Sequence, residues 1–244
     1  MSEKHHSDLE TFYTESLDIV ADNEIQAAYD AAIAYNSMLA EGISSAPPVA
    51  YSNLLNVTTD GIMGYIQIPK LRVELPICHG TDAETLEYAV GHVVGTSLPI
   101  GGKGTHAVLS AHSGMAVSKL FSDLDKLVEG DTFYIHVLDQ VLAYEVDQIA
   151  VVEPGDTTPL MIEKDADYVT LVTCTPFGVN THRLLVRGHR VEQISLLVTG
   201  ENSSAAVMST WMQHYLTGLG ISLGLLLLLL GGFYLIKRRN LCDE

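Results

Sequence analysis

Three side chains in this sequence have the types needed for acyl transfer, and each stands where a predicted strand meets a loop. Cys174 follows the apolar segment 168–173, and the residues after it include Pro176 and Gly178, which favour a turn. A thiol at the end of a rigid strand and beside a loop is well placed to act as a nucleophile. Local sequence alone supports a small buried hydrophobic side chain at this position equally well.

A histidine and an arginine could serve such a thiol. His112 follows the predicted strand 107–110, and imidazole can donate and accept protons near neutral pH. Arg183 begins another apolar strand after the loop 175–182. If the strands of Cys174 and Arg183 are neighbours, the guanidinium returns to the thiol and could stabilise an oxyanion. The alternatives are a structural histidine and a surface ion pair.

Other chemistries lack the spacing they require. The histidines are scattered and there is no CxxC or HExxH pair, so we expect no metal. No glycine-rich loop joins a strand to a helix, which argues against nucleotide chemistry. The formal net charge of -17 argues against nucleic acid as a partner, because phosphate contacts need clustered Lys and Arg.

Alternating apolar and polar residues predict a mainly β domain that positions these side chains. Segments with strand character recur at 66–68, 73–77, 107–110, 133–137, 142–146, 168–173 and 183–186. An apolar pattern over 120–128, followed by Gly130, predicts one inserted helix. Many short strands with one or two helices indicate a closed or nearly closed β-barrel.

The chain divides by composition into successive segments. Ile25, Tyr29 and Ile33 recur every four residues among alanines, which predicts a helix over 9–39, and Pro47-Pro48 cannot continue it. We expect an N-terminal helical segment, a connector, a barrel, a juxtamembrane linker, a transmembrane helix and a cytoplasmic tail, at residues 1–42, 43–60, 61–195, 196–215, 216–236 and 237–244.

The segment Leu216–Ile236 has no formal charge and is long enough, at about 30 Å as a helix, to span a bilayer. A buried core helix is the alternative. Because Lys237 and two arginines follow it, the positive-inside rule places the tail in the cytoplasm and the large domain outside. An external domain needs a translocation signal, and Met1–Asp30 has no such pattern. We therefore expect the natural N-terminal signal segment to be absent from this sequence.

The cysteines are Cys78, Cys174 and Cys242, of which the last would lie inside the cell. A disulfide between Cys78 and Cys174 is possible from sequence alone. If they are unpaired, a free thiol in an external domain indicates nucleophilic catalysis. We interpret Cys78 as a packing residue.

The residues around Cys174 resemble a known family. The run Thr170-Leu171-Val172-Thr173-Cys174 looks like the TLxTC signature of sortases, and the later arginine and earlier histidine follow the family's order. The segment 64–70 looks like the family's first-strand run. Segments at 75–77, 79–81, 95–99 and 181–188 are also similar to the pilin-polymerising subgroup, class C. A C-terminal membrane helix also fits this subgroup. The resemblance covers roughly residues 25–239.

This resemblance implies a sortase-type β-barrel with Cys174 as nucleophile, His112 as acid/base and Arg183 as transition-state stabiliser, without metal or organic cofactor. Such a cysteine transpeptidase cleaves an LPxTG-like sorting motif between Thr and Gly through a thioacyl enzyme. A pilin lysine then resolves the intermediate and gives an isopeptide bond. The implied partners are pilins or surface proteins with that motif, and the membrane of a Gram-positive bacterium.

The sequence departs from the subgroup before the barrel. Class C enzymes commonly carry an Asp-Pro-aromatic lid there, whereas this chain has Pro47–Tyr51, so we expect a lidless or minimally lidded member. Ser113 stands where Arg is frequent, and Phe177 where Tyr is. Three alternatives stay open: a cell-wall-anchoring sortase that uses a peptidoglycan amine, a non-catalytic membrane-tethered binding domain, and an unrelated cysteine peptidase.

Overall fold

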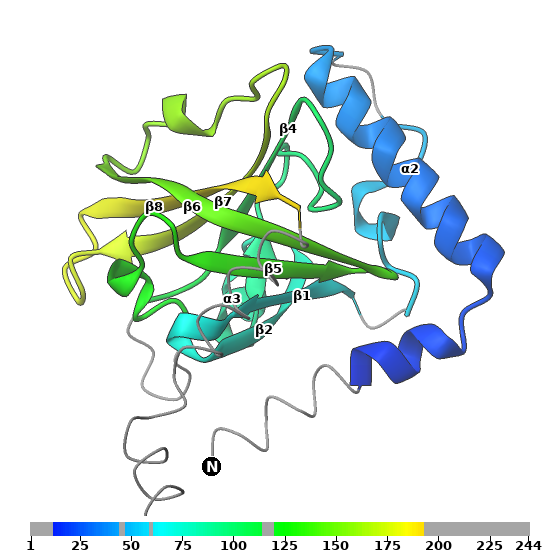
Figure 1. Ribbon diagram of the computed structural model, residues 1–244, viewed down its shortest axis with the longest axis horizontal. Helices are drawn as coiled ribbons and strands as arrows, with labels where there is room; N and C mark the ends of the chain where they lie inside the picture. Colours follow the sequence, from blue (N-terminus) through cyan, green and yellow to red (C-terminus); the bar gives the residue numbers. More distant parts are fainter. Residues whose placement is uncertain (1–11, 44–46, 59–60, 114–119, 193–244) are drawn as a thin grey trace, which may run out of the picture. The chain divides into compact units, whose positions relative to one another are not determined.

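Eight strands close into a barrel in the order β1-β2-β3-β4-β7-β8-β6-β5 (Figure 1). The computed structural model describes residues 12–192 except 44–46, 59–60 and 114–119. The prediction of a closed, mainly β barrel is therefore confirmed. Among the described residues no helix is long and apolar enough to cross a membrane, and the segment 216–236 lies outside them.

The strands are β1 (Ile62–Ile68), β2 (Val73–His79), β3 (Val90–His92), β4 (Thr105–Ser110), β5 (Thr132–Val137), β6 (Gln140–Val152), β7 (Asp167–Thr175) and β8 (His182–Val191). Two neighbouring pairs, β2–β3 and β4–β7, are parallel, and the others are antiparallel. Seven of the strands were expected from the sequence. The prediction missed β3, because three residues are too few to show a period of two.

The barrel interior is filled by the alternate residues of its strands. Phe133 of β5 and Tyr144 of β6 are both fully buried and stack with ring centroids 5.6 Å apart. Gly188 of β8 leaves room for them, because a Cβ there would lie 2.6 Å from the Phe133 ring. The strands therefore interlock through matched large and small residues.

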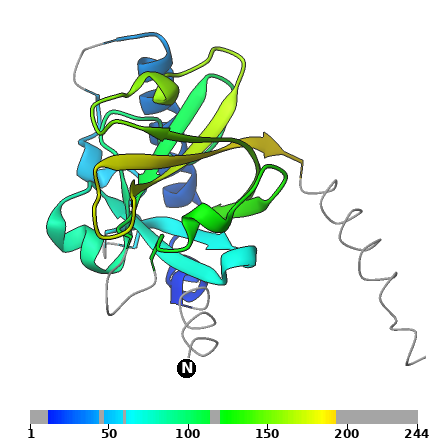
Figure 2. The same ribbon diagram turned by 90° about the vertical axis from the view of Figure 1, so that its left-hand side faces the viewer.

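The N-terminal helical segment is divided in two. Residues 12–18 form a short helix, and α2 (Asp22–Ala40) follows after a break at 19–21, so the prediction of one helix over 9–39 was wrong at this point. Asn36 of α2 is buried and exchanges two hydrogen bonds with the backbone of Leu98, at 3.1 and 2.7 Å. Figures 1 and 2 show α2 on the side of the barrel away from the β7–β8 turn.

The remaining helices are short: α3 (Ala83–Tyr88), and the 3₁₀ turns η1 (Tyr51–Asn53), η2 (Pro69–Leu71), η3 (Leu124–Lys126) and η4 (Thr158–Leu160). The helix expected over 120–128 is only η3 within the described residues, so that prediction was wrong. Leu120, Phe121, Leu124 and Leu127 are all buried. Their spacing reflects burial of an irregular segment, in which Leu120 has a positive φ of 35°.

Candidate active site

Cys174 and Arg183 lie directly opposite each other on β7 and β8. The two strands are antiparallel neighbours, so the side chains of an opposed pair project from the same face of the sheet. Cys174 is half-buried rather than part of the core. The structure therefore places the two predicted residues opposite each other on neighbouring strands, as their positions on either side of the 176–181 turn suggested.

His112 reaches the same end of the barrel by a different route. Strand β4 runs parallel to β7, with Ser110 opposite Val172, so both strands end at the same edge. The backbone N–H of Ala111 then donates to the Val172 carbonyl at 3.1 Å, which extends the pairing to the residue before His112. His112 is half-buried and lies two residues after the end of β4. Cys174 is the last residue but one of β7.

Two hydroxyl groups tie the His112 segment to the strand of Cys174. Thr173 Oγ1 donates to the Ala111 carbonyl at 2.8 Å, and Ser113 Oγ donates to the Cys174 carbonyl at 2.8 Å. These bonds hold the residues on either side of His112 to the residues at and before the thiol. In the sequence, Thr173 was noted only as part of the signature and Ser113 only as a departure from the class C subgroup. The hydrogen bonds by which they position the site were therefore not predicted.

Thr170, the first threonine of the signature, contacts the buried side chain of His106. Thr170 and Cys174 are four residues apart on β7, so their side chains project from the same face of the sheet. Thr170 Oγ1 lies 2.7 Å from Nε2 of His106, whose Nδ1 lies 3.0 Å from the Met161 carbonyl. A carbonyl can only accept, so His106 donates from Nδ1 and accepts from the Thr170 hydroxyl at Nε2. Burial, the main cause, lowers the pKa of His106, which favours this neutral form. His106 thus anchors the β6–β7 loop to β4 and β7.

Neither Cys78 nor Cys174 forms a disulfide, so the pairing that the sequence left open between them is absent. Cys78 is 5% exposed on β2, in agreement with its interpretation as a packing residue. Cys242 lies outside the described residues.

Arg183 and Arg187, both on β8, have different kinds of hydrogen-bond partners. Nη1 of Arg183 donates to the carbonyls of Asn180 and His182, at 3.3 and 3.0 Å, so the guanidinium lies over the β7–β8 turn. Arg187, by contrast, makes two 3.0 Å bonds to the carboxylate of Asp147. Among the described residues no carboxylate pairs with Arg183, which argues against the surface ion pair considered above.

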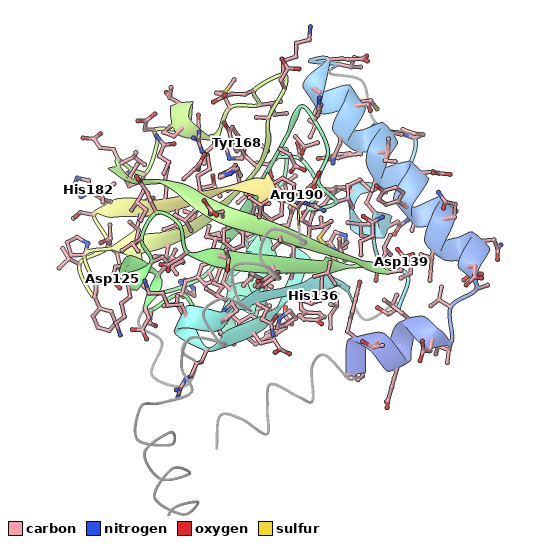
Figure 3. The ribbon with its side chains drawn as sticks, in the orientation of Figure 1. Asp125, His136, Asp139, Tyr168, His182 and Arg190 are labelled. Carbon is pink, nitrogen blue, oxygen red and sulfur yellow. The ribbon has the colours of Figure 1, made fainter. Side chains whose placement is uncertain are left out.

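A small cavity of about 50 Å³ lies beside Cys174. It is lined by Ser113, Phe121, Ser122, Asp125, Thr173, Cys174, Thr175, Phe177 and Leu184. Phe177 is 68% exposed on the β7–β8 loop, so an apolar ring stands at the site without being part of the core. Figure 3 shows Asp125 and His182 at this end of the barrel, with Arg190 at the other end of β8. Within the described residues no His, Cys, Asp and Glu side chains gather as a metal site.

Tyr51 of the connector before the barrel contacts β2 and β3, and its ring also lies against Tyr35 of α2. The hydroxyl of Tyr51 lies 2.8 Å from Nδ1 of His92, and the ring packs edge-on against His79 at 5.1 Å. Burial, the main cause, raises the pKa of Tyr51 to about 12. No residue of Pro47–Tyr51 lines the cavity beside Cys174. A lidless or minimally lidded enzyme stays a prediction.

A larger surface cavity, of about 900 Å³, lies at the opposite end of β7 from the thiol. Its charged lining includes Asp167, which accepts hydrogen bonds from the Tyr144 hydroxyl and the Gly102 backbone N–H. Asp167 and Cys174 stand at opposite ends of a strand, about 23 Å apart at the usual rise per residue. The volume of a cavity therefore does not identify the reactive site in this protein, and we place that site at Cys174.

Barrel and thiol site together define a β-barrel cysteine acyltransferase. The family model described as a sortase domain matches residues 66–191, and the chain belongs to the sortase family. Sortases are cysteine transpeptidases. Among curated relatives, "Sortase D" of Bacillus subtilis is 31% identical over 52% of this chain and 63% of its own length. "Sortase A" of Bacillus anthracis is 29% identical over 53% of this chain. The chain spans only 60% of the length of that second relative.

Solved structures of class C sortases match more of the chain. Sortase C1 from Streptococcus agalactiae is 44% identical with a TM-score of 0.72, and covers 75% of this chain and 97% of its own. Sortase C from Clostridium perfringens, solved with a C-terminal cell wall sorting motif, is 45% identical with a TM-score of 0.67, over 78% of this chain and 98% of its own. Sortase C from Streptococcus pneumoniae is 41% identical with a TM-score of 0.69, over 76% and 97%. The predicted resemblance to class C sortases is confirmed.

Proposed function

We propose that this chain is a class C-like sortase that cleaves an LPxTG-like sorting motif and joins pilin subunits through an isopeptide bond to a lysine. The single observation that carries the proposal is the placement of Cys174 opposite Arg183, with the His112 segment hydrogen-bonded to the same strand. A binding domain without catalysis would have no need for these three residues to lie at the same end of the barrel.

The proposed reaction has two acyl-transfer steps. The thiolate of Cys174 attacks the Thr carbonyl carbon of the sorting motif, and the guanidinium of Arg183 stabilises the oxyanion that forms. Protonated His112 gives its proton to the leaving Gly amine, which leaves a thioacyl enzyme. A primary amine then attacks the thioester, the C–S bond breaks, and neutral His112 accepts a proton from the attacking nitrogen.

The assignment to class C is supported by solved structures that align with this chain over most of their own length. The sortase C structures of Streptococcus agalactiae and Clostridium perfringens are 44% and 45% identical. The sortase C structure of Streptococcus pneumoniae is described as giving insight into pilin substrate specificity. A cell-wall-anchoring sortase is the second candidate, because curated relatives named Sortase A match at 26–29% identity. The two candidates differ only in the amine that resolves the thioester.

Membrane attachment is part of the proposal. The uncharged run Leu216–Ile236, followed by Lys237, Arg238 and Arg239, supports a C-terminal anchor with the barrel outside the cell. An enzyme tethered this way would meet pilin or surface-protein substrates at the outer face of the membrane.

Mass spectrometry with a matched pair of cysteine variants tests the proposed reaction. The full chain in detergent is mixed with a pilin that carries an LPxTG-like tail, and adducts and multimers are measured. We expect a thioacyl adduct on Cys174 and lysine-linked multimers, both lost in Cys174→Ala and both kept in Cys78→Ala. Equal loss in the two variants would overturn the assignment of Cys174. An adduct without multimers would favour the cell-wall-anchoring reaction.

A further inference from the structure

The cavity beside Cys174 contains a carboxylate that cleavage of a sorting motif does not use. Asp125 belongs to η3 and is exposed at one side of this cavity. Within the described residues its carboxylate makes no hydrogen bond or ion pair. Asp123, on the same segment, pairs with Nζ of Lys126 at 2.7 Å. Among the described residues Lys126 therefore pairs directly with Asp123 and acts on Asp125 only through space, and Asp125 lines the same cavity as Cys174.

The size and lining of this cavity suit a primary ammonium group. A volume of about 50 Å³ exceeds the roughly 10–15 Å³ that is needed to hold one water molecule, so a group of ammonium size fits. Its polar lining includes Asp125, Ser113 and Ser122, and none of the described residues that line it is Lys or Arg. Three ammonium hydrogens need three acceptors, which these groups offer. Phe177 and Leu184 provide apolar surface for an alkyl stem.

We propose that Asp125, with Ser113 and Ser122, binds the ε-ammonium of the lysine that resolves the thioacyl enzyme. This inference rests on the proposed function and adds the place where the second substrate enters. A peptidoglycan amine shares the ammonium chemistry, but lysine carries a four-carbon stem that fits the apolar surface of Phe177 and Leu184. The proposal therefore commits to lysine.

The resolving step balances as follows. The bound ammonium loses one proton to solvent, and the neutral amine nitrogen attacks the thioester carbonyl carbon. A C–N bond forms and the C–S bond breaks, so the electron pair returns to Sγ of Cys174. The second proton of the nitrogen passes to His112. Asp125 takes no part in bond making. It raises the local concentration of the cationic nucleophile, so its removal should act on KM for the amine rather than on kcat.

Competition between amines tests this assignment. Full-length enzyme in detergent receives a sorting-motif peptide together with Nα-acetyl-lysine methylamide, and hydroxylamine, which is uncharged at neutral pH, serves as the reference nucleophile. We expect Asp125→Asn to lower the ratio of lysine product to hydroxamate roughly two- to five-fold at low salt, as for an exposed ion pair. Asp125→Glu should restore part of the ratio.

Glu129→Gln is the matched control, because it removes an exposed carboxylate of the same segment that does not line the cavity. An equal loss in Glu129→Gln would assign the effect to overall charge and overturn the subsite. So would an unchanged ratio in Asp125→Asn. Triglycine separates the sources: an equal loss with this α-amine would overturn the commitment to lysine. If no hydroxamate forms in the wild-type enzyme, the proposed function itself fails.

Discussion

At the residue scale, short polar contacts with the backbone fix the candidate site. Two hydroxyls, from Thr173 and Ser113, hold the His112 segment to β7. The sequence predicted which residue types to examine, because a cysteine at a strand end, a histidine and an arginine are chemically distinctive. It did not predict the hydroxyl contacts, because threonine and serine are common and their partners are backbone atoms far away in the chain.

Thr170→Val tests the contact that holds His106. Valine keeps the shape of the side chain but removes the donor to Nε2 of a histidine that is 1% exposed, which leaves a buried acceptor without its partner. We expect the free energy of unfolding to fall by about 1–3 kcal/mol, measured by urea titration. Thr158→Val, at an exposed position of η4, should change it by no more than about 0.5 kcal/mol. Equal effects would contradict the role of Thr170.

At the element scale, the site depends on two strand pairings that differ in how readily they can be predicted. Strands β7 and β8 are consecutive and separated by a short turn, so the meeting of Cys174 and Arg183 could be anticipated from their spacing. The pairing of β4 with β7 brings His112 to the same edge, but β5 and β6 intervene in the chain. Neither periodicity nor turn residues specify such a distant parallel pair. The apolar spacing over 120–128 led to a wrong prediction of a helix, because the buried residues of an irregular segment can have the spacing of one helix face.

Gly64→Ala tests the close approach of β1 and β5. A Cβ at Gly64 would collide with the backbone carbonyl of His136, and a strand cannot move aside without breaking its own pairing. We expect a loss of about 3 kcal/mol in the free energy of unfolding, measured by urea titration. Gly155→Ala is the control, since a Cβ there meets nothing within 4 Å and should change stability by no more than about 0.5 kcal/mol. A Gly64→Ala protein with the wild-type midpoint would show that the strands can separate without cost.

At the scale of the whole molecule, the closed barrel buries histidines that must stay neutral. His92 is fully buried, donates from Nε2 to the Ser97 carbonyl, and accepts at Nδ1 from the Tyr51 hydroxyl. Burial, the main cause, lowers its pKa to about 4, and His79 adds a smaller lowering. His106 is lowered in the same direction by burial, with Arg187 acting in the same sense and Glu163 and Asp147 against it. Closure of the barrel thus makes stability depend on pH.

The direction of that dependence follows from where the protons bind. A histidine has a pKa of about 6.5 in the unfolded chain, so the unfolded state takes up protons first as the pH falls. The stability due to neutral His92 is therefore complete above pH 6.5 and lost progressively down to about pH 4, by about 3 kcal/mol in total. Urea midpoints measured from pH 7.5 to 4.5 should decline steeply, with a shallower slope in His92→Gln. Exposed His182→Gln should keep the wild-type slope, and a slope unchanged in His92→Gln would show that His92 is not the group that couples folding to pH.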